Sequence, residues 1–447
     1  MTDARRRSGA SPAREGAVEI LREIRERGGR ASALVAARGA NLSDPDRGLQ
    51  RELVLGVLRH RTALDAELAA ASRLPLGKLS PGVREVLEVA LYQLRHLDRV
   101  PDFAAVDEAV TQARRRGGAG GARLVNAVLR RLGREVAPTI GGASSDDADA
   151  AWALFFSHPE FLIRRWRERF GDAAARGVLA ADNAASPLDL LANPRRTSRE
   201  ELRRALAAEG IATEESLLSP LALSIRSGNP VRSPRLASGE FAIQDIGSQI
   251  LPLLLPPGEL LVDLAAAPGG KSFSALAHGT ARRTVALDRS ARRLRVLREN
   301  ARRLGMPEAA PTVADFAATP LPDGRFDRVL LDAPCSGTGT LRKNPEIRWR
   351  LSPEAIARIA EGQVAALGAA SRLLALDGML LYSTCSLERE ENEGVVERVL
   401  SQEPGLRLEE PAPPAPLQGF VSGATFRMLP GETHDGFTAH LLRRIAT

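Results

Sequence analysis

The stretch LLVDLAAAPGGKSF, residues 260–273, decides the fold. Its apolar run ends in Asp263 and breaks into a Pro-Gly-Gly turn before a helix-compatible segment, which is typical of a buried strand followed by a glycine loop and a helix N-terminus. Gly269 and Gly270 lack a β-carbon, so the backbone can approach a ligand, and the helix presents unpaired N–H groups at its positive end. The stretch therefore predicts a site for a cofactor with a polar face.

The same loop is within one residue of a phosphate-binding P-loop. The pattern G-x-x-x-x-G-K-[ST] is satisfied from Gly270 to Ser272, but Ala265 stands where the first glycine belongs. Pro268 also removes a backbone donor from the segment that would wrap the phosphates. A plain glycine turn between strand and helix is a third interpretation, and spacing alone leaves all three open.

Composition bounds the class of protein. A chain of 447 residues is too long for one ordinary core, so two or three domains are expected. The longest apolar candidate for a membrane span, residues 250–268, is interrupted by prolines and two acidic residues. The arginines at positions 5–7 have no apolar region behind them, so residues 1–14 are predicted to be a disordered basic leader. We expect a cytoplasmic protein that does not contact a membrane.

Excess positive charge is confined to the N-terminal part of the chain. Residues 1–135 hold 25 basic and 17 acidic side chains, whereas the remainder holds 37 and 38. All but three of the cations are arginines, and arginine both forks onto phosphate and stacks on bases. The distribution favours a polyanionic partner, although a GC-rich genome would produce the same arginine bias.

The hydrophobic pattern divides the chain into segments. Helical spacing predicts an all-α domain over residues 15–135, and small and acidic residues without periodicity predict a linker over 136–150. Residues 151–237 predict a small α+β lead-in, in which Ser198 and Glu201 form a capping box. The last domain is expected over residues 238–447.

Strands and helices alternate through this last domain. Apolar runs at 260–264, 284–287, 312–314, 328–331 and 379–382 are separated by helical stretches, the longest over residues 353–376. The alternation predicts an α/β doubly wound parallel sheet, to which residues 420–429 and 437–444 add a terminal antiparallel hairpin. Ligands of such sheets bind beyond the carboxyl ends of the strands.

Acidic and sulfur-containing side chains gather at the predicted strand ends. One set is Asp263, Asp288, Asp315 and Asp332, and the other is the only two cysteines, Cys335 and Cys385. An acid about 20 residues after a glycine loop is placed to accept hydrogen bonds from ribose hydroxyls. The shared position favours a nucleophilic thiol site over two buried core cysteines, and no Cys/His cluster predicts a metal.

Seven ordered motifs carry a resemblance to a known family. They are AIQDIGSQ (242–249), DLAAAPGGK (263–271), ALDRS (286–290), VAD (313–315), DAPCSGTGT (332–340), YSTCS (382–386) and LPGETHDGF (429–437). Together they resemble the NOL/NOP/Sun (Fmu-type) RNA cytosine-C5 methyltransferases, which use S-adenosylmethionine. The first 133 residues resemble a NusB-like RNA-binding domain through DRGLQRELVLGVLRHRTALD and AVDEAV followed by LVNAVLRRL. The sequence departs from many relatives at Ala265 (usually Cys) and Lys343 (usually His).

The resemblance implies a Rossmann-like class I methyltransferase that acts on small-subunit (16S) ribosomal RNA. It assigns attack on cytosine C6 to Cys385, the cytosine N3/N4 edge to Asp332, and assistance with loss of the C5 proton and release of Cys385 to Cys335. The implied cofactor contacts are Ala265, Ala266, Ala267, Pro268, Gly269, Gly270, Lys271, Asp288 at the ribose, Asp315 at the adenine, and Asp332. Three alternatives stay open: another methylated RNA (tRNA or 23S rRNA), a non-catalytic RNA-binding assembly factor, and a P-loop ATPase.

Overall fold

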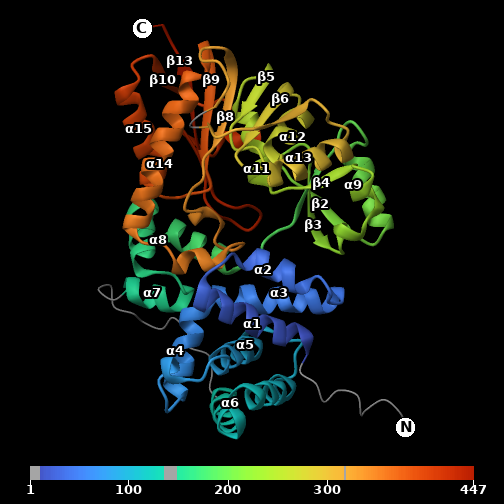
Figure 1. The fold of residues 1–447 in the computed structure, drawn as a ribbon, viewed down its shortest axis with the longest axis vertical. Helices are drawn as coiled ribbons and strands as arrows, with labels where there is room; N and C mark the ends of the chain where they lie inside the picture. Colours follow the sequence, from blue (N-terminus) through green and yellow to red (C-terminus); the bar gives the residue numbers. More distant parts are fainter. Residues whose placement is uncertain (1–10, 135–147, 317–318, 447) are drawn as a thin grey trace. The chain divides into compact units, whose positions relative to one another are not determined.

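The computed structural model describes residues 11–134, 148–316 and 319–446, which divide into two compact units (Figure 1). Unit 1 contains the described residues up to Ala185 together with Leu341–Arg350, and unit 2 contains Ser186–Thr340 and the described residues from Leu351 onward. The two helices over residues 148–183 therefore belong with the N-terminal helices. The sequence had placed them in the lead-in, because their amphipathic pattern does not say which core they complete.

Unit 1 is helical. Its helices are α1 (Pro12–Arg27), α2 (Ala31–Gly39), α3 (Asp44–Arg59), α4 (Arg61–Ala71), α5 (Val83–His96), α6 (Asp102–Leu132), α7 (Ala148–Phe156) and α8 (Glu160–Asn183). Helix α1 shows why they form, since Ala17, Ile20, Leu21 and Ile24 recur at three- and four-residue spacing and are all buried in one core. The predicted all-α architecture of this region is confirmed.

The segment Leu341–Arg350, which directly follows the DAPCSGTGT motif (332–340), is also part of unit 1. Arg348, in the 3-10 helix Pro345–Trp349, is fully buried. Its guanidinium donates to the carbonyl oxygens of Arg59 (3.0 Å), Ser157 (3.1 Å) and Asp182 (3.2 Å), and to Oδ1 of Asn183 (3.0 Å). Burial lowers the pKa of Arg348 to about 10, with Asp182 opposing that effect. One arginine thus ties together helices α3 and α8 and the α7–α8 turn.

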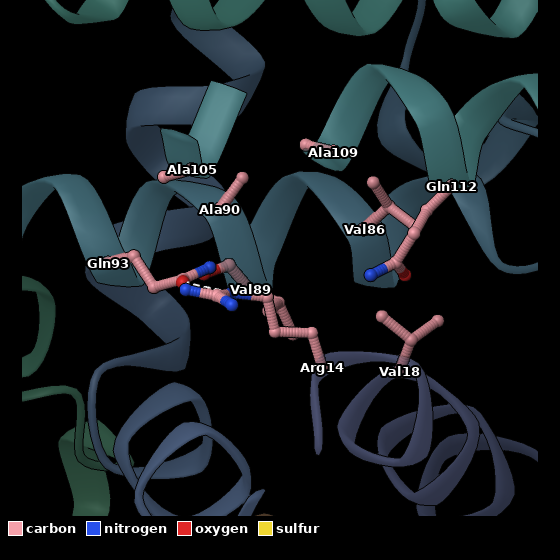
Figure 2. A pocket seen from close by; sticks show the side chains of 9 residues that line it. All are labelled: Arg14, Val18, Val86, Val89, Ala90, Gln93, Ala105, Ala109 and Gln112. Carbon is pink, nitrogen blue, oxygen red and sulfur yellow. Dashed lines mark hydrogen bonds between the residues drawn. The ribbon is translucent and has the colours of Figure 1, made fainter. Parts of the chain in front are cut away.

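A small cavity lies between α1, α5 and α6 (Figure 2). Arg14 donates to Oε1 of Gln93 across it (2.6 Å), while Oε1 of the buried Gln112 has no hydrogen-bond partner among the described residues. Its volume, about 10 Å³, is the room needed for one water. The cavity is therefore too small for an organic ligand.

Unit 2 begins with a four-stranded antiparallel sheet in the order β2-β3-β1-β4. Its elements are β1 (Asp189–Ala192), α9 (Arg199–Ala208), β2 (Ala212–Glu215), β3 (Ala222–Ser227), α10 (Pro234–Ala237) and β4 (Phe241–Ile243). The predicted capping box is present at the start of α9, where the side chain of Ser198 accepts from the N–H of Glu201 and the Glu201 carboxylate accepts from the N–H of Ser198. The α+β character expected here is confirmed.

A second, larger sheet forms the rest of unit 2, in the order β11-β12-β13-β9-β8-β5-β6-β7, with β10 paired to β13. Its strands are β5 (Gly258–Asp263), β6 (Ala281–Asp288), β7 (Ala309–Val313), β8 (Phe326–Asp332), β9 (Leu374–Thr384), β10 (Leu406–Glu409), β11 (Val421–Ser422), β12 (Thr425–Met428) and β13 (Phe437–Arg444). Strands β5 to β9 pair in parallel, and β13 and its neighbours pair antiparallel, as predicted. Because strand order reverses between β5 and β8, a ligand crevice is expected at their carboxyl ends.

Helices cover both faces of this sheet (Figure 1). They are α11 (Ile246–Ile250), α12 (Gly270–Ala277), α13 (Ala291–Leu304), α14 (Pro353–Arg372), α15 (Glu393–Gln402) and the short α16 (Ala415–Gln418). Strand alternation directs Val262 to the core shared with α14 and α15, and Leu261 to the core shared with α11 and α12. The doubly wound architecture is confirmed.

Several boundaries differ from the sequence prediction. The long helix ends at Arg372 and not at residue 376, because Leu374 already pairs with Phe326 as the first residue of β9. Strand β10 was not predicted. Helix α1 begins at Pro12 and α7 at Ala148, inside the expected leader and linker, whose remaining residues 1–10 and 136–147 lie outside the described part of the chain. Within the described ranges, no helix is long and apolar enough to cross a membrane.

Candidate active site

The glycine loop joins β5 to α12 at the point where the strand order reverses. Gly269 has φ +110° as the N-cap of α12, and its N–H donates to the carbonyl of Ala266 (2.7 Å). A β-carbon at Gly269 would lie 2.4 Å from a ring carbon of Phe273, so only glycine fits. Ala266 donates to the carbonyl of Leu287 (2.8 Å), which holds the loop over the end of β6.

Asp263 is a structural residue and not part of an exposed acidic rim. It is fully buried and accepts a hydrogen bond from Oγ of Ser272 (2.7 Å). Burial raises the pKa of Asp263 to about 6, although the Ser272 hydrogen bond acts in the opposite direction. The expectation that four acids line one rim is therefore wrong at this position, because the side chain of a strand's last residue can face the interior.

The loop does not suit a nucleoside triphosphate. In a P-loop the Ser/Thr hydroxyl binds magnesium and the lysine reaches the phosphates. Here the Ser272 hydroxyl is buried against Asp263, and Nζ of Lys271 forms an ion pair with Oδ2 of Asp332 (2.7 Å). Both groups are engaged within the protein, which disfavours the ATPase interpretation.

Asp288 ends β6 and offers a free acceptor. Its Oδ1 accepts from the N–H of Ser290 (2.8 Å) and from Arg293 (2.8 Å), while its buried Oδ2 has no hydrogen-bond partner among the described residues. A pair of ribose hydroxyls would satisfy that oxygen. Asp315 lies two residues beyond the end of β7 and is exposed. The loop cradle and the free oxygen of Asp288 fit a nucleoside cofactor lying along the strand ends.

The two cysteines meet. Cys335 follows β8 and Cys385 follows the neighbouring strand β9, and their sulfur atoms lie 3.2 Å apart although 50 residues separate them in sequence. Both are free thiols and partly buried. The hydrogen bond to Cys385, followed by burial, raises the pKa of the Cys335 thiol well above its usual value. The raised pKa favours the neutral thiol at Cys335.

Asp332 stands next to this pair. Its Oδ2 is paired with Lys271, and its Oδ1 accepts from Oγ of Ser383 on β9 (3.1 Å). Burial acts to lower the pKa of Lys271, but the nearby Asp332 carboxylate outweighs it and Cys385 adds to the effect, so the pKa is raised. Lys271 therefore keeps its positive charge beside the thiols.

Two features of the site were not predicted from sequence. One is the Lys271–Asp332 ion pair, since Lys271 had been assigned to the cofactor cradle. The other is the buried Glu391, which lies in the segment LEREEN (387–392) directly after the YSTCS motif. Three acids in close succession after a strand end were the available signal, but an acidic run is more often a solvated surface.

Three family models match successive parts of the chain: the NusB family over residues 11–134, the RsmF/B-like ferredoxin-like domain over 158–232, and 16S rRNA methyltransferase RsmB/F over 251–443. The probable ribosomal RNA small subunit methyltransferase B of Bacillus subtilis is 35% identical over 398 residues, covering 87% of this chain and 88% of its own. The corresponding protein of Thermus thermophilus is 36% identical over 433 residues, covering 96% and 97%. The chain belongs to the ribosomal RNA small subunit methyltransferase B family.

Solved structures share the fold of this family member. PH0851 aligns with a TM-score of 0.78 at 24% identity, covering 98% of this chain and 99% of its own. NSun6 from Pyrococcus horikoshii aligns with a TM-score of 0.57 at 21% identity, covering 65% and 99%. Membership in the family supports S-adenosylmethionine-dependent methylation of RNA, which agrees with the class I methyltransferase architecture of the larger sheet.

Proposed function

We propose that this protein transfers a methyl group from S-adenosylmethionine to C5 of a cytidine in 16S ribosomal RNA through a transient bond between Cys385 and cytosine C6. The observation that carries the proposal is the 3.2 Å separation of the Cys335 and Cys385 sulfur atoms beside the Lys271–Asp332 pair. A family of small-subunit rRNA methyltransferases supports the substrate class.

Cytosine C5 by itself is too poor a nucleophile to attack the methyl group. The enzyme must therefore first add a nucleophile of its own to the neighbouring carbon, C6. When the Cys385 thiolate adds to C6, the new C6–S bond turns C5 into an enamine-like carbon that can attack an electrophilic methyl group. When bound, S-adenosylmethionine supplies that methyl group from its sulfonium. Release then requires transfer of the C5 proton to a base together with cleavage of the C6–S bond, and Cys335, 3.2 Å from Cys385, is placed to assist that step.

Asp332 and Lys271 prepare the ring for attack. Asp332 would hold the N3/N4 edge of the cytosine in its protonated, electron-poor form, and the proton on N3 offsets the negative charge that develops on the ring when the thiolate adds to C6. Lys271 balances the charge of Asp332 and sets a positive charge near Cys385. On the cofactor side, residues 265–271 would cradle the methionine end, Asp288 the ribose and Asp315 the adenine edge.

RNA recognition is assigned to the NusB-like part of unit 1, proposed to span residues 15–135. Arg130, Arg131 and Arg134 at the end of α6 line one surface hollow. Phosphate contacts of this kind would offset the cost of turning a cytidine out of a stem, which is about a few kcal/mol.

The choice of cofactor has support from a protein of the same fold. NSun6 from Pyrococcus horikoshii was crystallised with SFG, an S-adenosylmethionine analogue.

The test is methylation of unmodified 16S rRNA with radiolabelled S-adenosylmethionine, followed by digestion and identification of 5-methylcytidine. Cys385→Ala should abolish product while cofactor binding persists. Cys335→Ala should let the covalent RNA adduct accumulate as a retarded band under denaturing conditions. Near-normal turnover by Cys385→Ala, or an adduct in that variant alone, would refute the assigned roles.

A further inference from the structure

Glu391 is a buried acid at the centre of a hydrogen-bond cluster behind the two cysteines. Its side chain is fully buried in the short 3-10 helix Arg389–Glu391, which lies between β9 and α15. Its Oε1 accepts from the N–H of Ser336 (2.7 Å) and from Nε2 of Gln363 on α14 (3.2 Å), and its Oε2 accepts from the hydroxyls of Ser336 and Ser386. Four donors converge on this one carboxylate.

The two serines connect Glu391 to the two cysteine loops. Ser336 directly follows Cys335, and Ser386 directly follows Cys385, so the Glu391 carboxylate accepts a hydrogen bond from the residue after each thiol. The two hydroxyls also lie 3.1 Å from each other. The pairing of β8 with β9 ends at Asp332 and Ser383, and beyond them the N–H of Gly339 donates to the Cys385 carbonyl (2.9 Å) and the N–H of Leu387 to Oγ1 of Thr338 (2.8 Å). The Glu391 carboxylate adds to these links at the residue directly after each cysteine.

Neighbouring contacts hold Glu391 itself in place. The Tyr382 hydroxyl donates to the Glu391 carbonyl (2.6 Å), and Oγ1 of Thr384 donates to Oδ1 of Asn392 (2.7 Å). The amide of Asn392 donates to the carbonyls of Ser386 (3.0 Å) and Glu388 (2.7 Å). Both carboxylate oxygens of Glu391 and both polar atoms of the Asn392 amide have partners, so a displacement of either side chain would leave a buried donor or acceptor without one.

We infer that Glu391 is a positioning residue for the methyl-transfer reaction: by binding Ser336 and Ser386 together it sets the distance between the Cys335 and Cys385 sulfur atoms. The inference rests on the proposed function. Glu391 touches neither thiol sulfur in the structure, so it acts through the two serines and not as a proton donor or acceptor to RNA.

Charge adds to this geometric role. Burial raises the pKa of Glu391, while the hydrogen bonds from Ser336 and Ser386 oppose the shift. The Glu391 charge is one of the smaller contributions, after Cys385 and burial, that raise the pKa of the Cys335 thiol. The Glu391 carboxylate thus adds to the rise in the pKa of the Cys335 thiol, besides its hydrogen bonds to the two serines.

The experiment compares Glu391→Gln and Glu391→Ala with the matched control Glu397→Gln, whose exposed carboxylate pairs with Arg389. Each variant's kcat is normalised to its fraction able to bind S-adenosylmethionine, so that loss of folded protein does not count. Misplacement of reacting groups by about 1 Å costs on the order of 10²-fold in rate, so Glu391→Ala should lower normalised kcat by about that factor while both KM values change less than about threefold. Glu391→Gln keeps the shape of the side chain and one acceptor oxygen, so its normalised kcat should lie between those of the wild-type protein and Glu391→Ala.

A second measurement guards against a variant that does not fold. Ser386→Ala removes the Ser386–Glu391 hydrogen bond from the other side, together with the bond that Oγ of Ser386 accepts from the N–H of Glu388 (3.0 Å), and should also lower kcat. The double variant with Glu391→Gln should lose less than the sum of the two single losses, because both changes break the Ser386–Glu391 contact. Unchanged normalised kcat in Glu391→Gln and Ser386→Ala, or losses confined to KM and cofactor binding, would overturn the inference. Failure of the proposed function looks different, since the wild-type protein would then make no 5-methylcytidine.

Discussion

Gly339 lies where two backbone segments touch behind the cysteines, and replacing it with alanine tests that packing. A β-carbon there would lie 2.6 Å from the carbonyl oxygen of Gly436 and 2.9 Å from two of its carbon atoms. The N–H of Gly339 donates to the carbonyl of Cys385 (2.9 Å), and its own carbonyl accepts from Gly436 (2.7 Å). The added methyl group must therefore push Gly436 away or move the Cys385 loop.

The size of the effect follows from these contacts. Ordinary carbon contacts begin near 3.5 Å, so the segments must separate by roughly 1 Å. Overpacking of this kind costs about 1–3 kcal/mol, and weakening a backbone hydrogen bond adds about 1 kcal/mol. We expect Gly339→Ala to lower the free energy of unfolding of unit 2 by about 2–4 kcal/mol and its Tm in calorimetry by roughly 5–10 °C.

The matched control is Gly362→Ala in α14. A β-carbon at Gly362 meets no atom within 4 Å, so alanine should raise stability by about 0.5–1 kcal/mol through the lower backbone entropy of the unfolded chain. Methylation by Gly339→Ala should also fall about 10²-fold, because the shift reaches Cys385. Equal stability of the two variants would refute the packing argument.

Three further predictions concern other groups. Arg348→Met leaves four oxygen atoms without their donor and should lower the free energy of unfolding of unit 1 by about 3 kcal/mol. All three tryptophans lie in unit 1, so their fluorescence during urea unfolding reports this change. An unchanged urea midpoint would contradict the stabilising role of Arg348. His60 has its pKa lowered by burial, and next by His96, to about 3, below the unfolded value of 6.5, so the unfolded state binds the extra proton and stability is lost as pH falls below about 6.5. Between pH 7.5 and 5 this amounts to about 2 kcal/mol, which His60→Phe should remove from the pH dependence of the same fluorescence transition. Asp288→Ala should weaken S-adenosylmethionine binding by about 10- to 10²-fold in calorimetric titration, whereas Asp327→Ala, at the opposite end of β8, should leave it unchanged.

The alternating pattern of the sequence was enough to predict most of the architecture. Apolar runs predicted β5, β6, β7, β8 and β9, the first four of them followed by acids, and Ser198 with Glu201 predicted the start of α9. These signals are local, because a strand's alternation and a helix cap depend on residues within a few positions of each other. The thiol pair was also predicted in outline, since carboxyl ends of neighbouring parallel strands meet at one edge.

What the tertiary structure decided concerns partners far apart in sequence. Residues 373–376 are apolar and read as a continuing helix, yet Leu374 becomes strand because Phe326 lies beside it. Asp263 and Asp332 both end strands, but Ser272 draws the first into the interior and Lys271 pairs with the second.

The amino-acid sequence by itself determined the two kinds of fold, the glycine loop and the two cysteines at adjacent strand ends. Only the folded structure assigned Glu391 to both cysteine loops and Arg348 to the helical unit. The physical reason is that burial and hydrogen bonding depend on which side chains the folded backbone brings within about 3 Å, and residue type and spacing do not specify that distance.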